Sequence, residues 1–445
     1  MRAKIPSPGS SAITRRELIG TAVAAALPAE PSDAASVTRK RAAPAGFLWG
    51  TAISAYQSEG NNTNADAWLM ENINPSMFKE RSGDACDSYH RYREDFAIAA
   101  KLGFNCYRLG IEWARIEPSE GDISNAELDH YARVLEACRA EGLRPIVTLN
   151  HFTTPLWFAE RGGFEVADAP AIFARYCQKV VQRLGHLMHL ATTFNEANIC
   201  LLVDLMPQFQ AAKPLVKASL AAAARATNSP KFSRLAYADP HIATPLLQEA
   251  HRRAYEAMKS SRPELPIGLT LTTQDIQASS PSLVAHYRDR LYGDWIDVAR
   301  GHADFFGVQT YTRLIFDEHG LRPPAAGAEL TLSGYEFYPK ALANTIRWAH
   351  HEIGKPIYVT ENGISTRDDR RRIAFINEAL DGVRECLDEG IPVHSYLYWS
   401  LLDNFEWTSG YGVPFGLVAV DRKTFRRTLK PSAIFLGERA RANQL

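Results

Sequence analysis

The chain has 445 residues, of which 46% are hydrophobic, and it carries 50 basic and 50 acidic side chains. This balance gives no electrostatic reason to expect nucleic acid or an anionic membrane as a partner, and the apolar content is enough for a large core. No run of about 18 uncharged apolar residues occurs, so the sequence predicts no membrane-spanning helix.

The first 40 residues are expected to be an export signal and a linker rather than part of the fold. Arg15 and Arg16 precede a short alanine-rich apolar stretch over residues 18–27, and small residues follow it. This order is similar to a twin-arginine signal, which predicts a periplasmic or secreted protein. The alternative is a chance arginine pair in the disordered tail of a cytoplasmic protein. We therefore divide the chain into residues 1–40 and one globular domain over residues 41–445.

From residue 47 onward, short apolar runs alternate with longer amphipathic stretches. The runs predicted as strands are 47–51, 105–111, 144–150, 191–195, 267–272, 305–310, 356–360 and 393–399. They are apolar without strict alternation, as expected for strands that are buried on both faces. Apolar residues at helical spacing predict helices over 125–141, 169–185, 243–260, 339–353 and 369–389. Gly142 is a typical residue to end the first of them.

The repeated alternation of strand and helix predicts a single (β/α)8 barrel, an α/β fold. The alternative is a doubly wound open sheet, which normally has a glycine-rich phosphate turn after its first strand; residues 50–56 read Gly-Thr-Ala-Ile-Ser-Ala-Tyr instead. Residues 323–328, rich in proline and alanine, are expected to form a loop over the C-terminal face. The six cysteines form no Cys-x-x-Cys pair, so we expect buried small side chains rather than a disulfide framework.

In this fold, reactive side chains are expected where the strands end, at the C-terminal face of the barrel. Two glutamates, Glu196 and Glu361, follow the fourth and seventh predicted strands. The other polar and aromatic residues at strand ends are Gln57, Glu59, Arg108, Glu112, His151, Asn195, Gln309, Tyr311, Trp399, Glu406 and Trp407. Cleaving an acetal needs a proton donor for the leaving oxygen and a carboxylate opposite the oxocarbenium-like carbon. For one isolated glutamate, a salt bridge would be the simpler interpretation, but the whole set predicts glycoside cleavage.

With these residues the chain resembles the glycoside hydrolases of family 1, the β-glucosidase type, from about residue 47 to residue 431. The segments that carry the resemblance are 47–60 (Phe-Leu-Trp-Gly-Thr-Ala at its start and Tyr-Gln-Ser-Glu-Gly at its end), 107–108 (Tyr-Arg), 149–155 (Leu-Asn-His-Phe-Thr-Thr-Pro), 193–196 (Thr-Phe-Asn-Glu), 358–363 (Tyr-Val-Thr-Glu-Asn-Gly) and 398–407 (Tyr-Trp-Ser-Leu-Leu-Asp-Asn-Phe-Glu-Trp). Any one of them could arise by chance, but six in this order are specific.

The resemblance implies a retaining mechanism with Glu361 as nucleophile and Glu196 as acid/base, their carboxyl groups about 5–5.5 Å apart. It also implies that Arg108, Tyr311 and Asn195 support the nucleophile. The residues that it implies for sugar binding are Gln57, His151, Asn195, Trp399, Glu406 and Trp407. No cofactor is implied, and no metal either, because no second histidine or cysteine joins His151 at ligand spacing.

The activity that the resemblance implies is hydrolysis of terminal β-D-glucosides, with β-galactosides or β-fucosides tolerated, in small carbohydrates or aryl and alkyl glycosides. Glu406 stands where phospho-glycosidases of the family have a serine-centred phosphate pocket, so a non-phosphorylated sugar is expected. Transglycosylation through the same intermediate and a glycan-binding pseudoenzyme are the alternatives. Departures from the family pattern at Glu112, Gln309 and Tyr335 leave the aglycone open, and Glu112 is expected either to form a salt bridge or to contact substrate.

Overall fold

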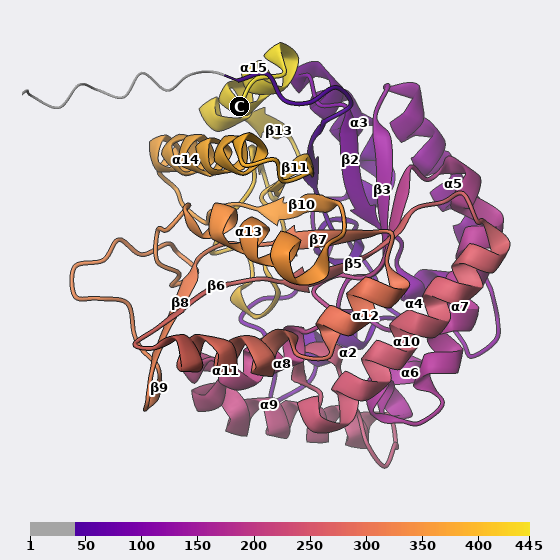
Figure 1. Cartoon of the computed structure of the whole chain (residues 1–445). Helices are drawn as coiled ribbons and strands as arrows, with labels where there is room; N and C mark the ends of the chain where they lie inside the picture. The colour runs from indigo at the N-terminus through magenta and orange to yellow at the C-terminus, as the bar shows by residue number, and fades with distance from the viewer. Residues whose placement is uncertain (1–40) are drawn as a thin grey trace, which may run out of the picture. The chain divides into compact units, whose positions relative to one another are not determined.

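The computed structural model describes residues 41–445, in which eight parallel strands close into a barrel inside a layer of helices (Figure 1). In order around the barrel, the strands are β1 (Leu48–Ala52), β11 (Val393–Trp399), β10 (Ile357–Asn362), β7 (Phe305–Gln309), β5 (Ile267–Thr272), β4 (Leu190–Phe194), β3 (Arg144–Asn150) and β2 (Cys106–Gly110). All eight predicted strands are therefore confirmed, as is the barrel. The predicted export signal lies outside the described residues.

Helices follow the strands along the chain and cover the outside of the barrel. They are α1 (Ala55–Ser58), α2 (Asp66–Asn72), α3 (Ser88–Leu102), α4 (Trp113–Ile116), α5 (Asn125–Ala140), α6 (Leu156–Glu160), α7 (Ala169–Leu184), α8 (Ile199–Leu205), α9 (Pro207–Ala226), α10 (Pro240–Ser261), α11 (Pro281–Tyr292), α12 (Trp295–His302), α13 (Ala341–Ile353), α14 (Asp369–Asp388) and α15 (Pro431–Ala442). Short 3-10 turns add η1 (Gly163–Glu165), η2 (Gly185–Leu187), η3 (Leu235–Tyr237) and η4 (Trp407–Ser409). The five predicted helices are α5, α7, α10, α13 and α14.

Local signals fix the ends of these helices. At the start of α5, the Ser124 side chain accepts a hydrogen bond from the Glu127 backbone N–H and satisfies one free donor of the first turn. After its last turn, Gly142 has a φ of 76°, a left-handed conformation that glycine adopts without strain. The predicted end of this helix is thus confirmed.

The interior of the barrel changes from apolar to polar along the strands. Its apolar part is a cluster of Leu48, Cys106, Ile146, Leu190, Phe305 and Leu397, with Tyr358 packed against it. Further along the strands, the Thr148 hydroxyl accepts hydrogen bonds from Arg108 Nε and from the Thr192 hydroxyl, both at 3.1 Å. The apolar cluster fills the barrel, so a polar site can open at the C-terminal ends of the strands alone.

Two small sheets, which the strand pattern did not predict, lie outside the barrel. One has the order β6 (Asp275–Ala278), β8 (Arg313–Asp317) and β9 (Gly320–Leu321), and the other pairs β12 (Val418–Val420) with β13 (Arg427–Leu429). Residues 323–328 after β9 contain no helix or strand, as predicted, and they are mostly exposed.

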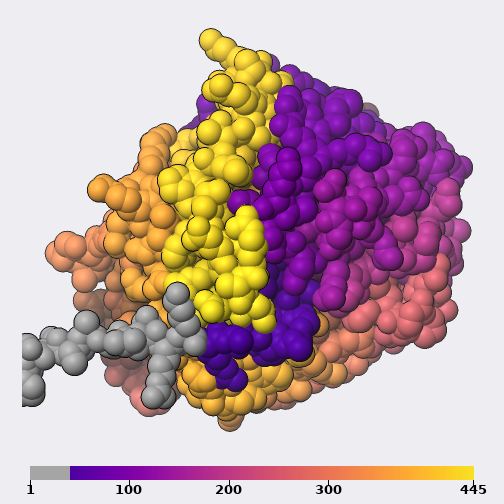
Figure 2. Space-filling model, turned by 90° about the horizontal axis from the view of Figure 1, so that it is seen from above, coloured from indigo at the N-terminus to yellow at the C-terminus, as the bar shows by residue number. Residues whose placement is uncertain are grey.

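The C-terminal helix packs against the first residues of the domain. Figure 2 shows α15, in yellow, beside the indigo start of the described chain. The backbone N–H of Ala43 donates to the carbonyl of Asn443 at 2.8 Å, and the Trp49 indole donates to the Asn443 side chain at 2.9 Å. Both ends of the domain are therefore fixed to the N-terminal side of the barrel, away from the ends of the strands that carry the glutamates.

All six cysteines are buried and unpaired, as expected for small core side chains. Among residues 41–445, none of the helices has both the length and the apolar character needed to cross a membrane.

Candidate active site

The carboxyl group of Glu361 is held by two donors at the end of β10. Arg108 on β2 donates one guanidinium N–H to Glu361 Oε1, and the Tyr311 hydroxyl donates to Oε2 at 2.6 Å. All three side chains come from different strands or strand ends, and Arg108 and Glu361 are almost fully buried. Both oxygens accept hydrogen bonds, one of them from a cation, so the arrangement favours the ionised carboxylate.

The backbone around Glu361 is shaped by two irregular features. The pairing of β10 with β7 shifts register between Val359 and Glu361, which redirects the side chains that follow. Two residues later, a Cβ on Gly363 would lie 2.1 Å from the carbonyl oxygen of Trp399 on β11. Glycine at this position therefore lets the ends of β10 and β11 approach closely, which brings Trp399 beside the glutamate.

Glu196 follows β4 in a conformation that side chains rarely adopt. Its φ is 44°, and its backbone N–H donates to Gln309 Oε1 at 3.1 Å and to the Thr270 hydroxyl at 3.2 Å. A left-handed conformation costs about 1 kcal/mol or more for a residue with a Cβ, so the surrounding contacts must hold it. Strained backbone of this kind clusters at functional sites.

The two glutamates differ in how their surroundings affect proton binding. Burial and the negative charge of Glu361 raise the pKa of Glu196 to about 8, while Thr272 and Arg108 act in the opposite direction. Burial also raises the pKa of Glu361, but Arg108 and Tyr311 oppose that effect with a charge and two hydrogen bonds. These surroundings favour the proton on Glu196 and the negative charge on Glu361.

Asn195 and Gln309 join the two glutamates into one network. Asn195 Oδ1 accepts hydrogen bonds from Arg108 Nη2 at 2.6 Å and from Gln309 Nε2 at 2.7 Å. Gln309 uses its other side-chain atom for the backbone of Glu196. The resemblance marked Gln309 only as a departure from the family pattern. The structure gives this side chain a use, since its one carboxamide spans both Asn195 and Glu196.

Aromatic side chains form one wall beside the glutamates. The His151 ring is stacked on Trp399 at 5.5 Å between centroids and on Trp407 at 6.2 Å, with interplanar angles of 20° and 16°. Trp407 is in turn stacked on Tyr56 at 5.8 Å. Flat apolar faces of this kind suit the C–H face of a pyranose ring.

Polar groups border the same wall. The Trp399 indole donates to Glu406 Oε1 at 3.3 Å, and burial raises the pKa of Glu406 to about 8. The backbone carbonyl of Gln57 accepts a hydrogen bond from Phe405, the residue before Glu406, which places Gln57 beside this loop. The structure thus brings the predicted sugar-binding residues to one end of the barrel.

Among residues 41–445, two buried polar atoms at this wall make no hydrogen bond of ordinary geometry to the protein. They are Gln57 Nε2 and His151 Nδ1, in side chains that are almost fully buried. Burial and the charge of Arg108 hold the pKa of His151 well below its usual range, so its ring is neutral. Unpaired buried polar atoms are rare in folded proteins. At this wall, both atoms are available to the hydroxyl groups of a ligand.

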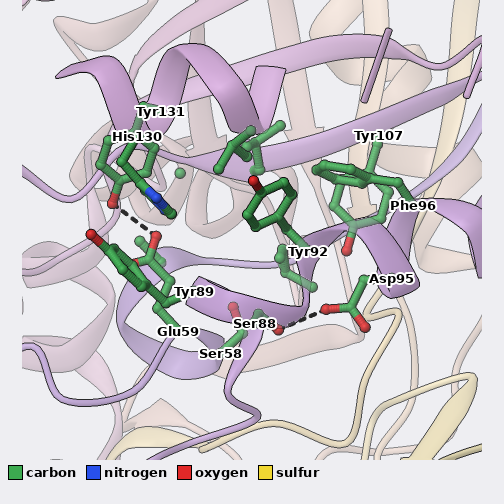
Figure 3. Close-up of a pocket in the computed structure, with 15 residues that line it drawn as sticks. Ser58, Glu59, Ser88, Tyr89, Tyr92, Asp95, Phe96, Tyr107, His130 and Tyr131 are labelled. Carbon is green, nitrogen blue, oxygen red and sulfur yellow. Dashed lines mark hydrogen bonds between the residues drawn. The ribbon is translucent and has the colours of Figure 1, made fainter. Parts of the chain in front are cut away.

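Glu59 and Glu112, also noted at strand ends, belong to a separate cluster. Glu59 accepts from the Tyr131 hydroxyl and from Arg115 Nε, each at 2.8 Å, beside a cavity of about 20 Å³ that is lined in part by Tyr89 and Tyr107 (Figure 3). A cavity of this size holds about one water molecule and is too small for a sugar.

The expectation that Glu112 forms a salt bridge is wrong. Its carboxylate accepts hydrogen bonds from the Thr153 hydroxyl, at 2.9 Å to Oε2, and from the Ala114 backbone N–H, which caps α4. Arg115, the nearby cation, pairs with Glu59 instead. Burial and the charge of Glu59 raise the pKa of Glu112 to about 7.

Comparison with known proteins gives consistent matches along the chain. A sequence model of glycosyl hydrolase family 1 matches residues 39–290 and 297–445. The β-glucosidase of Agrobacterium sp. (strain ATCC 21400) is 28% identical over 87% of this chain and 93% of its own length, and β-glucosidase A of Thermotoga maritima is 27% identical over 90% and 98%. Among solved structures, the apo structure of β-glucosidase 1317 is 47% identical with a TM-score of 0.87, covering 89% of this chain and 98% of that one.

Proposed function

We propose that this chain releases terminal non-phosphorylated β-D-glucosyl residues with retention of configuration. The chain belongs to glycosyl hydrolase family 1 and is a β-glucosidase-type glycoside hydrolase. The observation that carries the proposal is the contrast between Glu361, whose oxygens both accept hydrogen bonds, and Glu196, whose pKa is raised to about 8. A nucleophile and a proton donor are thus present together at neutral pH.

In the first step, the Glu361 carboxylate attacks the anomeric carbon. Glu196 donates its proton to the glycosidic oxygen as the bond from carbon to that oxygen breaks, and the aglycone leaves as an alcohol. The product is an ester between the sugar and Glu361. Arg108 and Tyr311 orient the carboxylate for this attack through the hydrogen bonds described above.

In the second step, water replaces the aglycone. Esterification removes the negative charge of Glu361, one of the two causes that raise the pKa of Glu196. That pKa therefore falls, and the Glu196 carboxylate left by the first step stays ionised and can act as a base. Glu196 takes a proton from water as the oxygen attacks the anomeric carbon, and Glu361 leaves as a carboxylate. Two inversions give net retention.

Charge at the site favours a neutral sugar. Within the part of the chain that the structure describes, Arg108 is the only cation that forms an ion pair with Glu361, and its guanidinium also binds Asn195 and Thr148. Among the same described residues, neither Glu196 nor Glu406 has such a partner. A sugar phosphate would bring two negative charges to these carboxyl groups without a cation to bind them, at a high desolvation cost.

Azide rescue of two alanine variants tests the two roles separately. Glu361→Ala with azide should give the α-glucosyl azide, because azide attacks in place of the nucleophile while Glu196 still protonates the leaving group. Glu196→Ala with an activated aryl glucoside and azide should give the β-azide, because the ester still forms. Exchanged anomers would refute the assignment.

Wild-type protein and the variant Glu112→Ala are the controls. Glu112 is a buried carboxyl that belongs to a different cluster, so its loss should give no glucosyl azide of either anomer. If the wild type binds glucose but cleaves no β-glucoside above the level of Glu361→Ala, the protein is a glycan-binding pseudoenzyme and the proposal fails.

We also propose that the protein is exported, on the strength of Arg15, Arg16 and the apolar stretch that follows them. N-terminal sequencing of protein from the native host would test this. A mature chain that begins within residues 28–41 and is found outside the cytoplasm is expected; a chain that keeps residue 2 in the cytoplasm would contradict export.

A further inference from the structure

Residues 330–336 form a short hairpin, here called the rim hairpin, that follows the β6–β8–β9 sheet. Leu330 and Glu336 pair across it in antiparallel register, and the Thr331 backbone N–H donates to the Tyr335 carbonyl at 2.8 Å. Gly334, with a φ of 79°, donates back to the Thr331 carbonyl at 2.9 Å and makes the tight turn. These bonds give the rim hairpin a defined shape.

The rim hairpin is attached to the strand end that carries Glu361. The backbone N–H of Leu332 donates to the carbonyl of Ser365 at 3.0 Å, and the hydroxyls of Ser333 and Ser365 are 2.7 Å apart. Ser365 lies four residues after Glu361 in the chain. The rim hairpin therefore lies at the mouth of the catalytic site rather than elsewhere on the surface.

Tyr335 connects the rim hairpin to the interior of the site. Its ring centroid is 6.3 Å from that of Tyr311, the residue that donates to the nucleophile. The pKa of Tyr335 is raised by burial and by the charges of Glu196 and Glu406, in agreement with a phenol that faces both groups. The inner arm of the rim hairpin thus borders the side of the pocket where Glu196 lies.

The side chains of Thr331, Ser333 and Glu336 in the rim hairpin are already engaged in hydrogen bonds. Thr331 Oγ1 accepts from the Tyr335 backbone N–H at 3.1 Å, and Ser333 is bonded to Ser365. Glu336 forms a two-bond ion pair with Arg313 on β8, with distances of 2.8 and 2.7 Å. These groups hold the hairpin in place and are not free to bind the hydroxyls of a second sugar.

Two leucines are the side chains that the rim hairpin exposes. Leu330 is 54% exposed and Leu332 is 44% exposed, and only six large apolar side chains among residues 41–445 reach such exposure. Single exposed leucines are ordinary. Here, however, two of the six stand on one short hairpin, separated by a single residue, and that hairpin is attached beside the strand end of Glu361. They offer neither the flat ring nor the free amides that sugars need.

We propose that the rim hairpin binds the leaving group of the substrate, and that this leaving group is an apolar alkyl or aryl chain rather than a second sugar. The inference rests on the proposed function, in which Glu196 protonates the glycosidic oxygen, so the aglycone must extend past Glu196 toward the mouth. There it meets Tyr335 first and then the side chains of Leu330 and Leu332. An apolar chain on these half-exposed leucines is removed from water, whereas a glucosyl unit would lose hydrogen bonds to it.

A series of alkyl β-D-glucosides, from methyl to octyl, tests the proposal through kcat/KM. With half-exposed leucines, each added methylene should contribute roughly half the free energy of full burial, which increases kcat/KM about two-fold per methylene, or about 130-fold over the seven methylenes from methyl to octyl. The double variant Leu330→Ser/Leu332→Ser should lower the ratio of octyl to methyl glucoside at least about five-fold and change methyl glucoside less than about two-fold.

Ile434→Ser on α15 is the matched control, because Ile434 is a 42% exposed apolar residue on the helix at the opposite end of the barrel. This variant should leave the ratio unchanged. The single variants Leu330→Ser and Leu332→Ser repeat the test if the double variant does not fold, as judged by its Tm.

Two results would overturn the inference while the proposed function stands. One is hydrolysis of methyl glucoside by the wild type without an increase along the series, or with an increase that the leucine variants keep. The other is an equal loss of activity toward cellobiose in the double variant, which would mean that the rim hairpin binds sugars. If the wild type releases glucose from no member of the series and not from an aryl β-glucoside, both proposals fail.

Discussion

The substitution Glu361→Gln separates the two causes of the raised pKa of Glu196. Glutamine keeps the size of the side chain and its carbonyl acceptor but removes the negative charge. Burial of Glu196 is unchanged, and the positive charge of Arg108 is no longer neutralised by a partner. Both changes in charge favour the ionised form of Glu196, so its pKa should fall.

The size of the fall follows from the separation of the carboxyl groups. Two unit charges about 5 Å apart, the spacing of retaining glycosidases, interact by about 3 kcal/mol at an effective dielectric constant of about 20. That energy corresponds to about a 100-fold change in proton affinity. The pKa of Glu196 should therefore fall from about 8 to about 6, and burial should keep it above the ordinary value of 4.5.

Carbon-13 NMR of protein labelled at the glutamate side-chain carboxyl can measure this titration. Comparison of Glu361→Gln with Glu361→Gln/Glu196→Gln identifies the signal of Glu196, and the wild type gives the reference midpoint. An unchanged midpoint of Glu196 would show that the two carboxyl groups do not interact, and the retaining geometry would then be wrong.

Contacts of Tyr311, Gly363 and Glu406 can each be tested by one substitution. Tyr311→Phe removes a 2.6 Å hydrogen bond to a charged nucleophile, and such a bond contributes about 1.5–3 kcal/mol. The kcat/KM on an aryl β-glucoside should therefore fall about 10- to 150-fold with little change in Tm, and a loss below about two-fold would mean that the phenol does not support the nucleophile. Gly363→Ala places a Cβ 2.1 Å from the Trp399 carbonyl oxygen and should lower the free energy of unfolding by more than about 4 kcal/mol. Gly301→Ala is the control, because it has open space around its Cβ and should not destabilise the protein. Equal effects of the two variants in a urea titration would contradict the close approach at Gly363. Glu406 binds its proton more tightly in the folded protein, where its pKa is about 8, than in the unfolded chain. Ionisation of Glu406 therefore destabilises the fold increasingly as the pH rises from about 4.5 to 8. Glu406→Gln should raise Tm by a few °C at pH 8 and not at pH 4, and a Tm difference that is independent of pH would contradict the raised pKa.

The barrel was predictable because its signals are local and repeated. Each strand is a buried apolar run, and helices such as α5 carry both an amphipathic face and a terminal glycine. The β6–β8–β9 sheet and the rim hairpin were not predicted, because their strands are short and partly exposed, so no apolar run marks them. Their pairing depends on how distant loops meet above the barrel.

The composition of the site was predictable, but the direction of each side chain was not. Strand ends identified Arg108, Tyr311 and Glu361, which the structure brings together. The same rule also selected Glu59 and Glu112, which turn toward Tyr131 and Thr153 in a separate cluster. Where a side chain points after a strand depends on the turn that follows, as the left-handed backbone of Glu196 illustrates, and such turns are set by tertiary contacts.

The proposed mechanism requires two carboxyl groups, those of Glu361 and Glu196, that act in sequence at one anomeric carbon. Proton NMR in deuterated buffer can identify the anomer of glucose that wild-type enzyme first releases from an aryl β-glucoside, before mutarotation mixes the two forms. Double displacement by Glu361, with Glu196 as acid and then base, predicts that β-glucose appears first. Initial release of α-glucose would show a single displacement by water and would contradict the assignment of Glu361 as nucleophile.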